Sequence, residues 1–282
     1  MNHDFLNLLQ EKTPGFSKGQ RRIAQYIMEA YDKAAFMTAS RLGKKVGVSE
    51  STVVRFAAEL GYDGYPDMQK SLQKMIRNRL TSVQRIEVTN DRIGDQDLVS
   101  MVLQSDMEKI RLTLEELDRD AFDHAVKAIV SAKRIYIIGV RSSAAIASFL
   151  GFYFNLIFDN VVNVTAGTAS EMFEHLLRVG EDDVVIGVSF PRYSSRTVQA
   201  MSFARDRKAT TVAITDSEAI CKYTLKARSD MASFGDSLVA PLSLVNALLV
   251  AVSRAKNDDL ANTFQTLERI WEDYGVYEKV QE

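Results

Sequence analysis

The sequence has little of what an extracellular or membrane protein needs. Its 282 residues include a single cysteine, Cys221, which excludes an intrachain disulfide and a zinc site built from cysteines. No run of about 18 uncharged apolar residues occurs, so no membrane-spanning helix is expected. The first residues, MNHDFLNLLQEKTPG, lack a basic region before an apolar run and do not predict a secretory signal. These absences favour a cytoplasmic protein with a reduced thiol and no contact with a membrane.

Patterns that would indicate a metalloenzyme or a cofactor are missing too. The sequence shows no cluster of metal ligands, no nucleophile paired with a base, no internal repeat and no low-complexity tract. We therefore expect no metal and no cofactor. Glu171, Glu174 and His175 lie together in EMFEH, and sugar isomerisation needs a base beside the reacting carbons. Their spacing is not that of an HExxH site, and a solvated helix face is the favoured interpretation.

Charge is distributed unevenly along the chain. Net charge is −2, and 46% of the residues are hydrophobic, which is ample for a buried core. Residues 1–80 hold 13 Lys/Arg and 8 Asp/Glu, whereas residues 81–282 hold 22 and 29. A basic first segment on an acidic body fits one domain that meets phosphates, joined to one that does not.

Residues 38–60, TASRLGKKVGVSESTVVRFAAEL, predict two short helices joined by a tight turn. Apolar residues recur at helical spacing on both sides of Gly47, which can adopt positive φ at little cost. Ser49 is a good N-cap for the second helix. Ser51, Thr52 and Arg55 are left on or beside the face opposite its apolar stripe. The pattern is that of a helix-turn-helix, whose second helix lies in the DNA major groove, and we favour this over a purely structural hairpin.

The polar groups of this segment divide into two kinds of expected DNA contact. Ser51, Thr52 and Arg55 are the candidates for the groove, with Arg55 the best candidate for a guanine edge. Other cations are expected to meet phosphates and so to set affinity and its salt dependence. They are Arg41, Lys44, Lys45, Lys18 and Arg21.

Further helices surround this motif. Ser17 and Gln20 fit a capping box for a helix over residues 17–31, and Pro66 is well placed to begin another. These helices predict an all-helical domain over residues 1–77. Residues 78–96 are polar and lose clear periodicity, so we interpret them as a linker, which can include helix.

Residues 97–282 show a different pattern. Two helical stretches, 98–116 and 120–132, precede short apolar runs that alternate with helices, and two helices close the chain. The alternation predicts an α/β domain with a mostly parallel sheet and flanking helices, so the whole chain is expected to be α + α/β. The predicted strands are residues 135–139, 161–164, 184–188 and 211–214, and the closing helices are 237–255 and 258–274.

Two strand-to-helix loops, after the first and third predicted strands, are rich in hydroxyl groups, in GVRSS and SFPRYSSRT. Ligands of open α/β sheets bind beyond the carboxyl ends of strands, and helix N-termini attract anions. A phosphate or a phosphorylated sugar is the natural guest, although serine and threonine are also ordinary N-caps. Arg141 can add a charge-assisted bond, and residues 215–217 form a weaker third candidate. The candidate ligand-binding residues are Ser142, Ser143, Ser189, Arg192, Ser194, Ser195 and Thr197.

These motifs resemble those of RpiR/MurR-type transcriptional regulators over nearly the whole chain. The N-terminal likeness lies in VSESTVVRFAAELGYDGYPDMQKSL and the C-terminal one in GVRSS, SFPRYSSRTVQA and AITDS. The resemblance implies a helix-turn-helix domain that binds an operator and a sugar isomerase (SIS) domain that senses a phosphosugar. It implies that Ser142, Ser143, Ser189, Ser194 and Thr197 hold the phosphate. Many SIS domains read Ser-x-Ser-Gly-x-Thr in the second loop, which is longer here.

We therefore expect a transcriptional regulator that binds double-stranded operator DNA as a homodimer or homotetramer and answers to a phosphosugar. One alternative is a phosphosugar isomerase with a helical N-terminal appendage. Another is a DNA-binding protein whose SIS fold only dimerises. The sequence names neither the sugar nor the operator, and it leaves the direction of regulation open.

Overall fold

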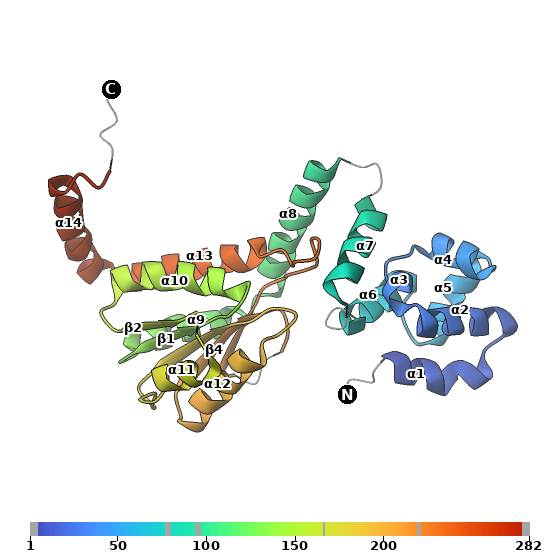
Figure 1. Cartoon of the computed structure of the whole chain (residues 1–282), viewed down its shortest axis with the longest axis horizontal. Helices are drawn as coiled ribbons and strands as arrows, with labels where there is room; N and C mark the ends of the chain where they lie inside the picture. The colour runs from blue at the N-terminus through green and yellow to red at the C-terminus, as the bar shows by residue number, and fades with distance from the viewer. Residues whose placement is uncertain (1–4, 77–79, 94–96, 166, 219–220, 278–282) are drawn as a thin grey trace. The chain divides into compact units, whose positions relative to one another are not determined.

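The computed structural model describes residues 5–76, 80–93, 97–165, 167–218 and 221–277 (Figure 1). The chain forms two compact units, one of residues 1–101 with 231–236 and one of residues 102–230 with 237–282. The predicted linker boundaries at residues 77, 78 and 96 lie outside the described residues.

The first unit is helical, as predicted. The Ser17–Gln20 capping box is present, with the Gln20 amide donating to Ser17 Oγ at 3.4 Å and the Ser17 amide donating to Gln20 Oε1 at 2.9 Å. A helix before it, α1, is not predicted from the sequence. The helices are α1 (Phe5–Lys12), α2 (Lys18–Glu29), α3 (Tyr31–Ala34), α4 (Ala39–Val46), α5 (Glu50–Glu59), α6 (Tyr65–Ile76) and α7 (Ser82–Ile93), with a 3-10 turn at Thr13–Gly15.

Helix α6 fixes the chain just before α4. The Tyr65 hydroxyl and the Gln69 amide donate to the carbonyl of Met37 at 2.6 and 2.7 Å, and the Gln73 amide donates to that of Ala35 at 2.8 Å. Burial raises the pKa of Tyr65 to about 12, so this hydroxyl stays protonated and can donate. Polar bonds thus position the helix-turn-helix above a core that includes buried Phe56.

Helix α7 falls within the segment predicted as a linker. Its Arg85 is 2% exposed, and Nη1 of Arg85 lies 3.0 Å from Oδ1 of Asp236. Met231 packs against the core of the same unit and forms an antiparallel bridge with Asp236. Residues 231–236 therefore complete the first unit, although they follow the last strand of the second.

The second unit is built on a parallel sheet with strand order β2-β1-β3-β4-β5, which confirms the predicted α/β fold. The strands are β1 (Ile135–Ile138), β2 (Val161–Val164), β3 (Val184–Val188), β4 (Thr210–Thr215) and β5 (Tyr223–Lys226). The helices are α8 (Leu98–Glu116, which begins in the first unit), α9 (Arg119–Ser131), α10 (Ser143–Ile157), α11 (Ala169–His175), α12 (Ser195–Asp206), α13 (Val239–Ala255) and α14 (Asn257–Asp273).

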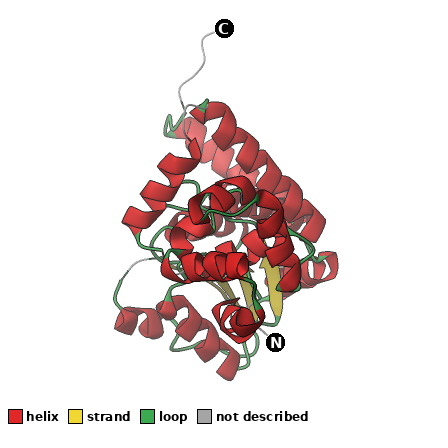
Figure 2. Ribbon diagram, turned by 90° about the vertical axis from the view of Figure 1, so that its right-hand side faces the viewer, coloured by secondary structure: helices red, strands yellow, loops and turns green. Residues whose placement is uncertain are grey.

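Helices cover both faces of this sheet (Figures 1 and 2). Alternate residues of β1 point to opposite sides, as the period of a strand requires. Ile135 and Ile137 pack with α9, α10 and α13, whereas Tyr136 and Ile138 pack with α11 and α12. A strand buried on both faces reads as a continuous apolar run, which is why IYII was recognisable from the sequence.

No single helix among the described residues has both the length and the apolar character to cross a bilayer. Helices α13 and α14 reach that threshold only when joined, and they are bent by 105° at their break.

Candidate functional sites

The turn between α4 and α5 depends on two glycines. Gly47 has φ of 69°, a left-handed conformation that a residue with a side chain adopts only at a cost. A Cβ on Gly43 would lie 2.8 Å from the carbonyl oxygen of Val48, so α4 approaches the turn too closely for any side chain at this position. The helix-turn-helix geometry is therefore specified locally.

The start of α5 carries a cluster of hydroxyl groups. Ser49 accepts a bond from the Thr52 amide at 3.3 Å, which confirms it as the N-cap. Its Oγ also lies 2.9 Å from Oγ of Ser51 and 2.8 Å from Oγ1 of Thr52. Ser51 is exposed and Thr52 is half-buried, so the first turn of α5 presents hydroxyls to the outside.

The outer face of α5 combines a cation with an aliphatic group. Arg55 is exposed, with Nε 3.4 Å from the carbonyl of Ser51 one turn earlier. Val54, which the sequence analysis did not single out, is 42% exposed and lies on the same face, three residues after Ser51. Its spacing from Ser51 is the signal that could have found it.

A shallow cleft of about 590 Å³ lies between the start of α2 and the start of α5. Arg22 closes one end by donating to the carbonyl of Gly47 at 2.9 Å. A Cβ on Gly19 would touch Val48 at 3.4 Å and Thr52 at 3.5 Å, so α2 closely approaches the turn and the start of α5 at this cleft. Arg55 lines the other side.

Exposed cations lie on α2 and α4, two helices that precede α5 in the chain. Arg41, Lys44 and Lys45 are exposed on α4, and Lys18 is exposed at the start of α2. Arg21 is exposed as well, but its guanidinium donates to the carbonyls of Phe16 and Pro14. All five predicted phosphate contacts are thus on the surface, and Arg21 has partners within its own loop.

In the second unit, the two hydroxyl-rich loops follow the neighbouring strands β1 and β3. The strand order reverses between these two strands. From β1 the chain passes to β2 on one side and then crosses to β3 on the other. Ile138 pairs with Gly187 in register, so the segments after β1 and β3 leave the same edge side by side. Open α/β sheets bind ligands in the crevice at such a switch point.

The loop after β1 runs tightly into α10. Arg141 has φ of 57°, and Ser142 holds the N-cap position without a side-chain cap bond. Ser142 is exposed and Ser143 is buried. A Cβ on Gly139 would lie 2.7 Å from Cβ of Ala147 and 2.8 Å from the carbonyl oxygen of Ser143, so only glycine allows this close approach.

The loop after β3 places hydroxyls around the start of α12. Ser194 holds the N-cap position with no side-chain cap bond, and Ser189 is half-buried beside β4. Thr197 is 2% exposed, and its Oγ1 has no hydrogen-bond partner. Ser195 and Arg192 are exposed. A buried hydroxyl without a partner in the first turn of a helix suits an anionic guest.

Neighbouring segments hold this second loop in place. Arg196 donates to the carbonyl of Gly167 at 3.0 Å, and the Tyr193 hydroxyl donates to Oδ1 of Asp216 at 2.7 Å. Asp216 belongs to the weaker third candidate, residues 215–217. These bonds tie the loop to the segments after β2 and β4.

Two family models match different parts of the chain. The helix-turn-helix domain of the rpiR family matches residues 3–79, and the SIS domain matches residues 128–251. The sugar isomerase domain of an RpiR transcription factor from Sphaerobacter thermophilus is 30% identical, with a TM-score of 0.59, and covers 62% of this chain and 99% of that one. The chain belongs to the RpiR family.

Two further proteins are similar to the chain over three quarters of its length or more. The NanR protein of Vibrio vulnificus, solved with ManNAc-6P, has a TM-score of 0.58 at 22% identity and covers 96% of this chain and 98% of that one. The transcriptional regulator HexR of Escherichia coli K12 is 25% identical over 75% of this chain and 72% of its own length. This RpiR-family chain is a transcriptional regulator with a helix-turn-helix and a SIS domain.

The acid–base candidates of the alternative isomerase function, Glu171, Glu174 and His175, lie on α11. Glu171 completes a capping box, with Oε2 2.5 Å from the Thr168 amide, and Glu174 accepts a bond from Ser170 at 3.0 Å. Glu171, Glu174 and His175 are all exposed. In the part of the chain that the structure describes, no three His, Cys, Asp or Glu side chains group as metal ligands.

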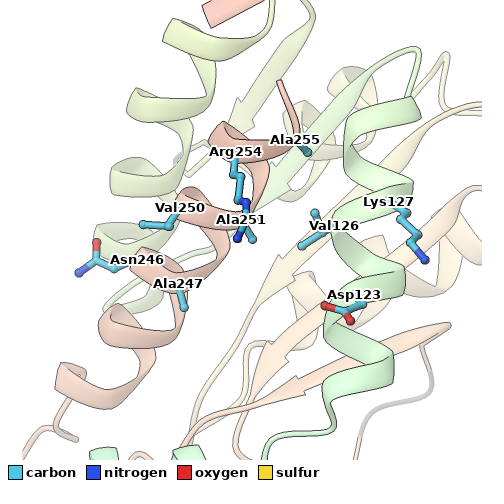
Figure 3. Close-up of a pocket in the computed structure, with 9 residues that line it drawn as sticks. All are labelled: Asp123, Val126, Lys127, Asn246, Ala247, Val250, Ala251, Arg254 and Ala255. Carbon is cyan, nitrogen blue, oxygen red and sulfur yellow. The ribbon is translucent and has the colours of Figure 1, made fainter. Parts of the chain in front are cut away.

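A second hollow of the SIS unit lies away from the switch point. Figure 3 shows a groove between α9 and α13, with a volume of about 660 Å³. Helix α9 supplies Asp123, Val126 and Lys127, and α13 supplies Asn246, Ala247, Val250, Ala251, Arg254 and Ala255. The floor of the groove is apolar, and none of the predicted ligand residues lines it. An apolar groove without a helix start offers little to a phosphate, so the crevice expected at the switch point is the better candidate.

Proposed function

We propose that this chain binds a specific operator through α5 and that a phosphorylated sugar in the switch-point crevice changes its affinity for that operator. In this proposal residues 1–77 carry DNA binding, residues 97–282 carry effector binding, and the intact regulator is a homodimer or homotetramer. Binding to operator DNA would place it in the cytoplasm.

The DNA half of the proposal rests on the exposed face of α5. In a helix-turn-helix, side chains that project from the second helix into the major groove read the bases, and Arg55, Ser51 and Val54 share the exposed face of α5. An arginine can bond both acceptors of guanine, and an aliphatic group can meet the methyl of thymine. Arg41, Lys44 and Lys45 then neutralise phosphates without reading sequence.

The effector half rests on the buried Oγ1 of Thr197, which lacks a partner at the start of α12. Together with Ser189, Ser194 and the start of α10, it offers neutral donors and two helix N-termini at one edge. The structural likeness to NanR, solved with ManNAc-6P, supports a phosphosugar as the class of ligand.

Coupling between the two events needs differential affinity. The effector must favour one of two arrangements of the DNA-binding halves, typically with a coupling free energy of about 1–3 kcal/mol. Both release and tightening satisfy this condition, so titrating operator complexes with the effector decides the direction.

The DNA half is tested by Arg55→Ala. We expect specific operator binding to be lost while sugar-phosphate binding survives, because Arg55 is exposed and its removal leaves the fold intact. Footprinting on the upstream DNA measures the first and calorimetry the second. An unchanged footprint would remove Arg55 from the groove.

The effector half is tested by a thermal-shift screen against phosphorylated sugars and amino sugars. A ligand that binds only the folded protein, at 100 times its dissociation constant, adds about 2.7 kcal/mol of stability. Ser189→Ala is then expected to weaken the best ligand without changing operator affinity in its absence. Equal calorimetric affinity of Ser189→Ala and wild type would exclude this residue.

The alternative function, a phosphosugar isomerase, makes the opposite demand. It requires turnover of an aldose or ketose phosphate and a base that faces the sugar. The exposed, cap-engaged Glu171 does not favour that role. Turnover that is lost in Glu171→Gln would replace the regulatory proposal.

A further inference from the structure

Helix α8 of the SIS unit buries two polar residues, Lys109 and Thr113, and exposes a row of apolar ones. Four large apolar residues recur at i, i+4, i+7 and i+11, the spacing of a helix–helix seam. They are 58%, 62%, 37% and 59% exposed in chain order. We call them the α8 stripe: Leu103, Met107, Ile110 and Leu114.

The polar side of α8 is anchored on its own unit. Lys109 is 4% exposed and donates to Oγ of Ser105 at 2.9 Å and to Oδ1 of Asp106 at 3.1 Å. Ser237, just before α13, donates to the same Asp106 oxygen at 2.6 Å. These bonds satisfy a lysine that would otherwise be costly to bury.

A second anchor lies one turn later. Thr113 is 7% exposed and accepts a bond from the Arg228 amide at 2.9 Å, and Arg228 is also ion-paired with Glu116. Rotating α8 to bury the stripe would break the bonds that join it to its unit, from Ser237 to Asp106 and from the Arg228 amide to Thr113. The stripe therefore cannot be covered by a rotation of α8 on its own unit.

From the exposure of these apolar residues we infer that the α8 stripe is the centre of a two-fold interface with α8 of a second copy. This deepens the homodimer of the proposed function. A stripe of this size on one helix marks an interaction surface, and a seam at heptad spacing fits another helix of the same kind.

Charge and spacing favour the antiparallel arrangement of a two-fold pair. With the axis between Met107 and Ile110, each of these residues faces the other type in the second copy, and Leu103 faces Leu114. The interface is then isologous, with the same patch on both copies.

The charged flank of α8 complements itself in that arrangement. Arg111 is paired within its helix with Glu108 at 2.6 Å and with Glu115. Antiparallel order brings Arg111 of one copy within about one turn, ~5 Å along the axis, of Glu108 of the second copy. Opposite charges then meet at the rim of an apolar seam, as in coiled coils.

Met107→Glu tests the seam in the full-length chain. A carboxylate at the centre of the seam is expected to raise the dimer dissociation constant by about tenfold or more, measured by sedimentation equilibrium. Val250→Glu is the matched control, because Val250 is 69% exposed on α13 of the same unit and lines the α9/α13 groove. We expect that control to dimerise as wild type does.

The charged flank gives a second test that keeps the seam apolar. Arg111→Glu gathers acids on both copies and is expected to weaken the dimer, whereas the double variant E108R/R111E is expected to restore it. Circular dichroism checks that each variant folds.

The outcomes separate this inference from the proposed function. A dimeric Met107→Glu protein, or a Val250→Glu protein that dissociates instead, would overturn the α8 interface and leave the regulator intact. A monomeric wild type with a normal operator footprint would overturn the dimer itself, as would a stripe covered by another part of the same chain.

Discussion

The two units differ in the groups that they offer to the anions proposed as their ligands. The helix-turn-helix displays exposed cations on flexible side chains, among them Arg41, Lys44 and Arg55. The switch-point crevice instead gathers hydroxyls and helix starts, with Thr197 buried and Ser194 at an N-cap. A polyanion such as DNA rewards many screened charges, whereas a single phosphate rewards a few fixed dipoles. We therefore expect a substitution at the proposed anion site of one unit to leave anion binding by the other unchanged.

The largest effect is expected from a substitution at Gly139, in the second unit. Gly139→Ala places a Cβ 2.7 Å from Ala147, so the loop after β1 or α10 must shift. We expect about 1–3 kcal/mol of destabilisation, the usual cost of overpacking, and loss of effector binding. Denaturation followed by circular dichroism measures the first and calorimetry the second.

Gly180→Ala is the control for that change, because a Cβ there meets nothing within 4 Å. Operator binding without effector should survive in both variants. If Gly139→Ala kept the wild-type effector affinity, the crevice would lie elsewhere.

The corresponding substitution in the first unit is at Gly47. Gly47→Ala forces a side chain into φ of 69° and is expected to cost about 1–2 kcal/mol of stability. Operator affinity should fall while effector affinity stays constant. Hydrogen exchange localises the loss to α4 and α5, and Gly15→Ala, with open space around it, serves as the neutral reference.

A smaller effect sharpens the description of the crevice. Thr197→Val removes a buried hydroxyl that has no partner in the protein, so the free protein should not lose stability. Effector affinity should fall by about tenfold, the equivalent of one hydrogen bond of ~1.4 kcal/mol. Unchanged affinity would show that the hydroxyl faces no ligand.

The smallest effect concerns salt. Lys44→Ala is expected to reduce the slope of log affinity against log salt by about 0.9 for one phosphate contact. Effector binding by the same variant should keep its own salt dependence, because Lys44 lies on α4 of the other unit. Equal operator slopes for wild type and variant would exclude a phosphate contact at Lys44.

Much of the fold could be predicted from the sequence because local signals agree with it. The apolar run of β1, the Ser17–Gln20 capping box and the turn at Gly47 each specify one structure. Strand β5 could not be predicted, since Tyr223–Lys226 is a short edge strand with only Leu225 buried. Helix α1 is eight residues long, and so short a stretch gives only a weak helical signal.

The candidate sites divide in the same way. The sequence predicted that Ser142 and Ser189 lie at the carboxyl ends of strands, because each follows a short apolar run and precedes a helix. It could not show that Oγ1 of Thr197 is left without a partner. Nor does helical periodicity tell which side of α8 is buried, since that side is fixed by distant residues, such as Ser237, which donates to Asp106.

The pairing of Arg85 with Asp236 has a consequence for how such regulators can be assembled from parts. The carboxylate comes from 151 residues downstream of the guanidinium, beyond the last strand of the sensor. A fragment ending at residue 101 would keep the cation and discard its counterion, and stranding a buried charge costs about 3–5 kcal/mol. The helix-turn-helix unit is thus incomplete without residues 231–236. A gene fusion that joined it to a different effector-binding domain would also have to supply a partner for Arg85.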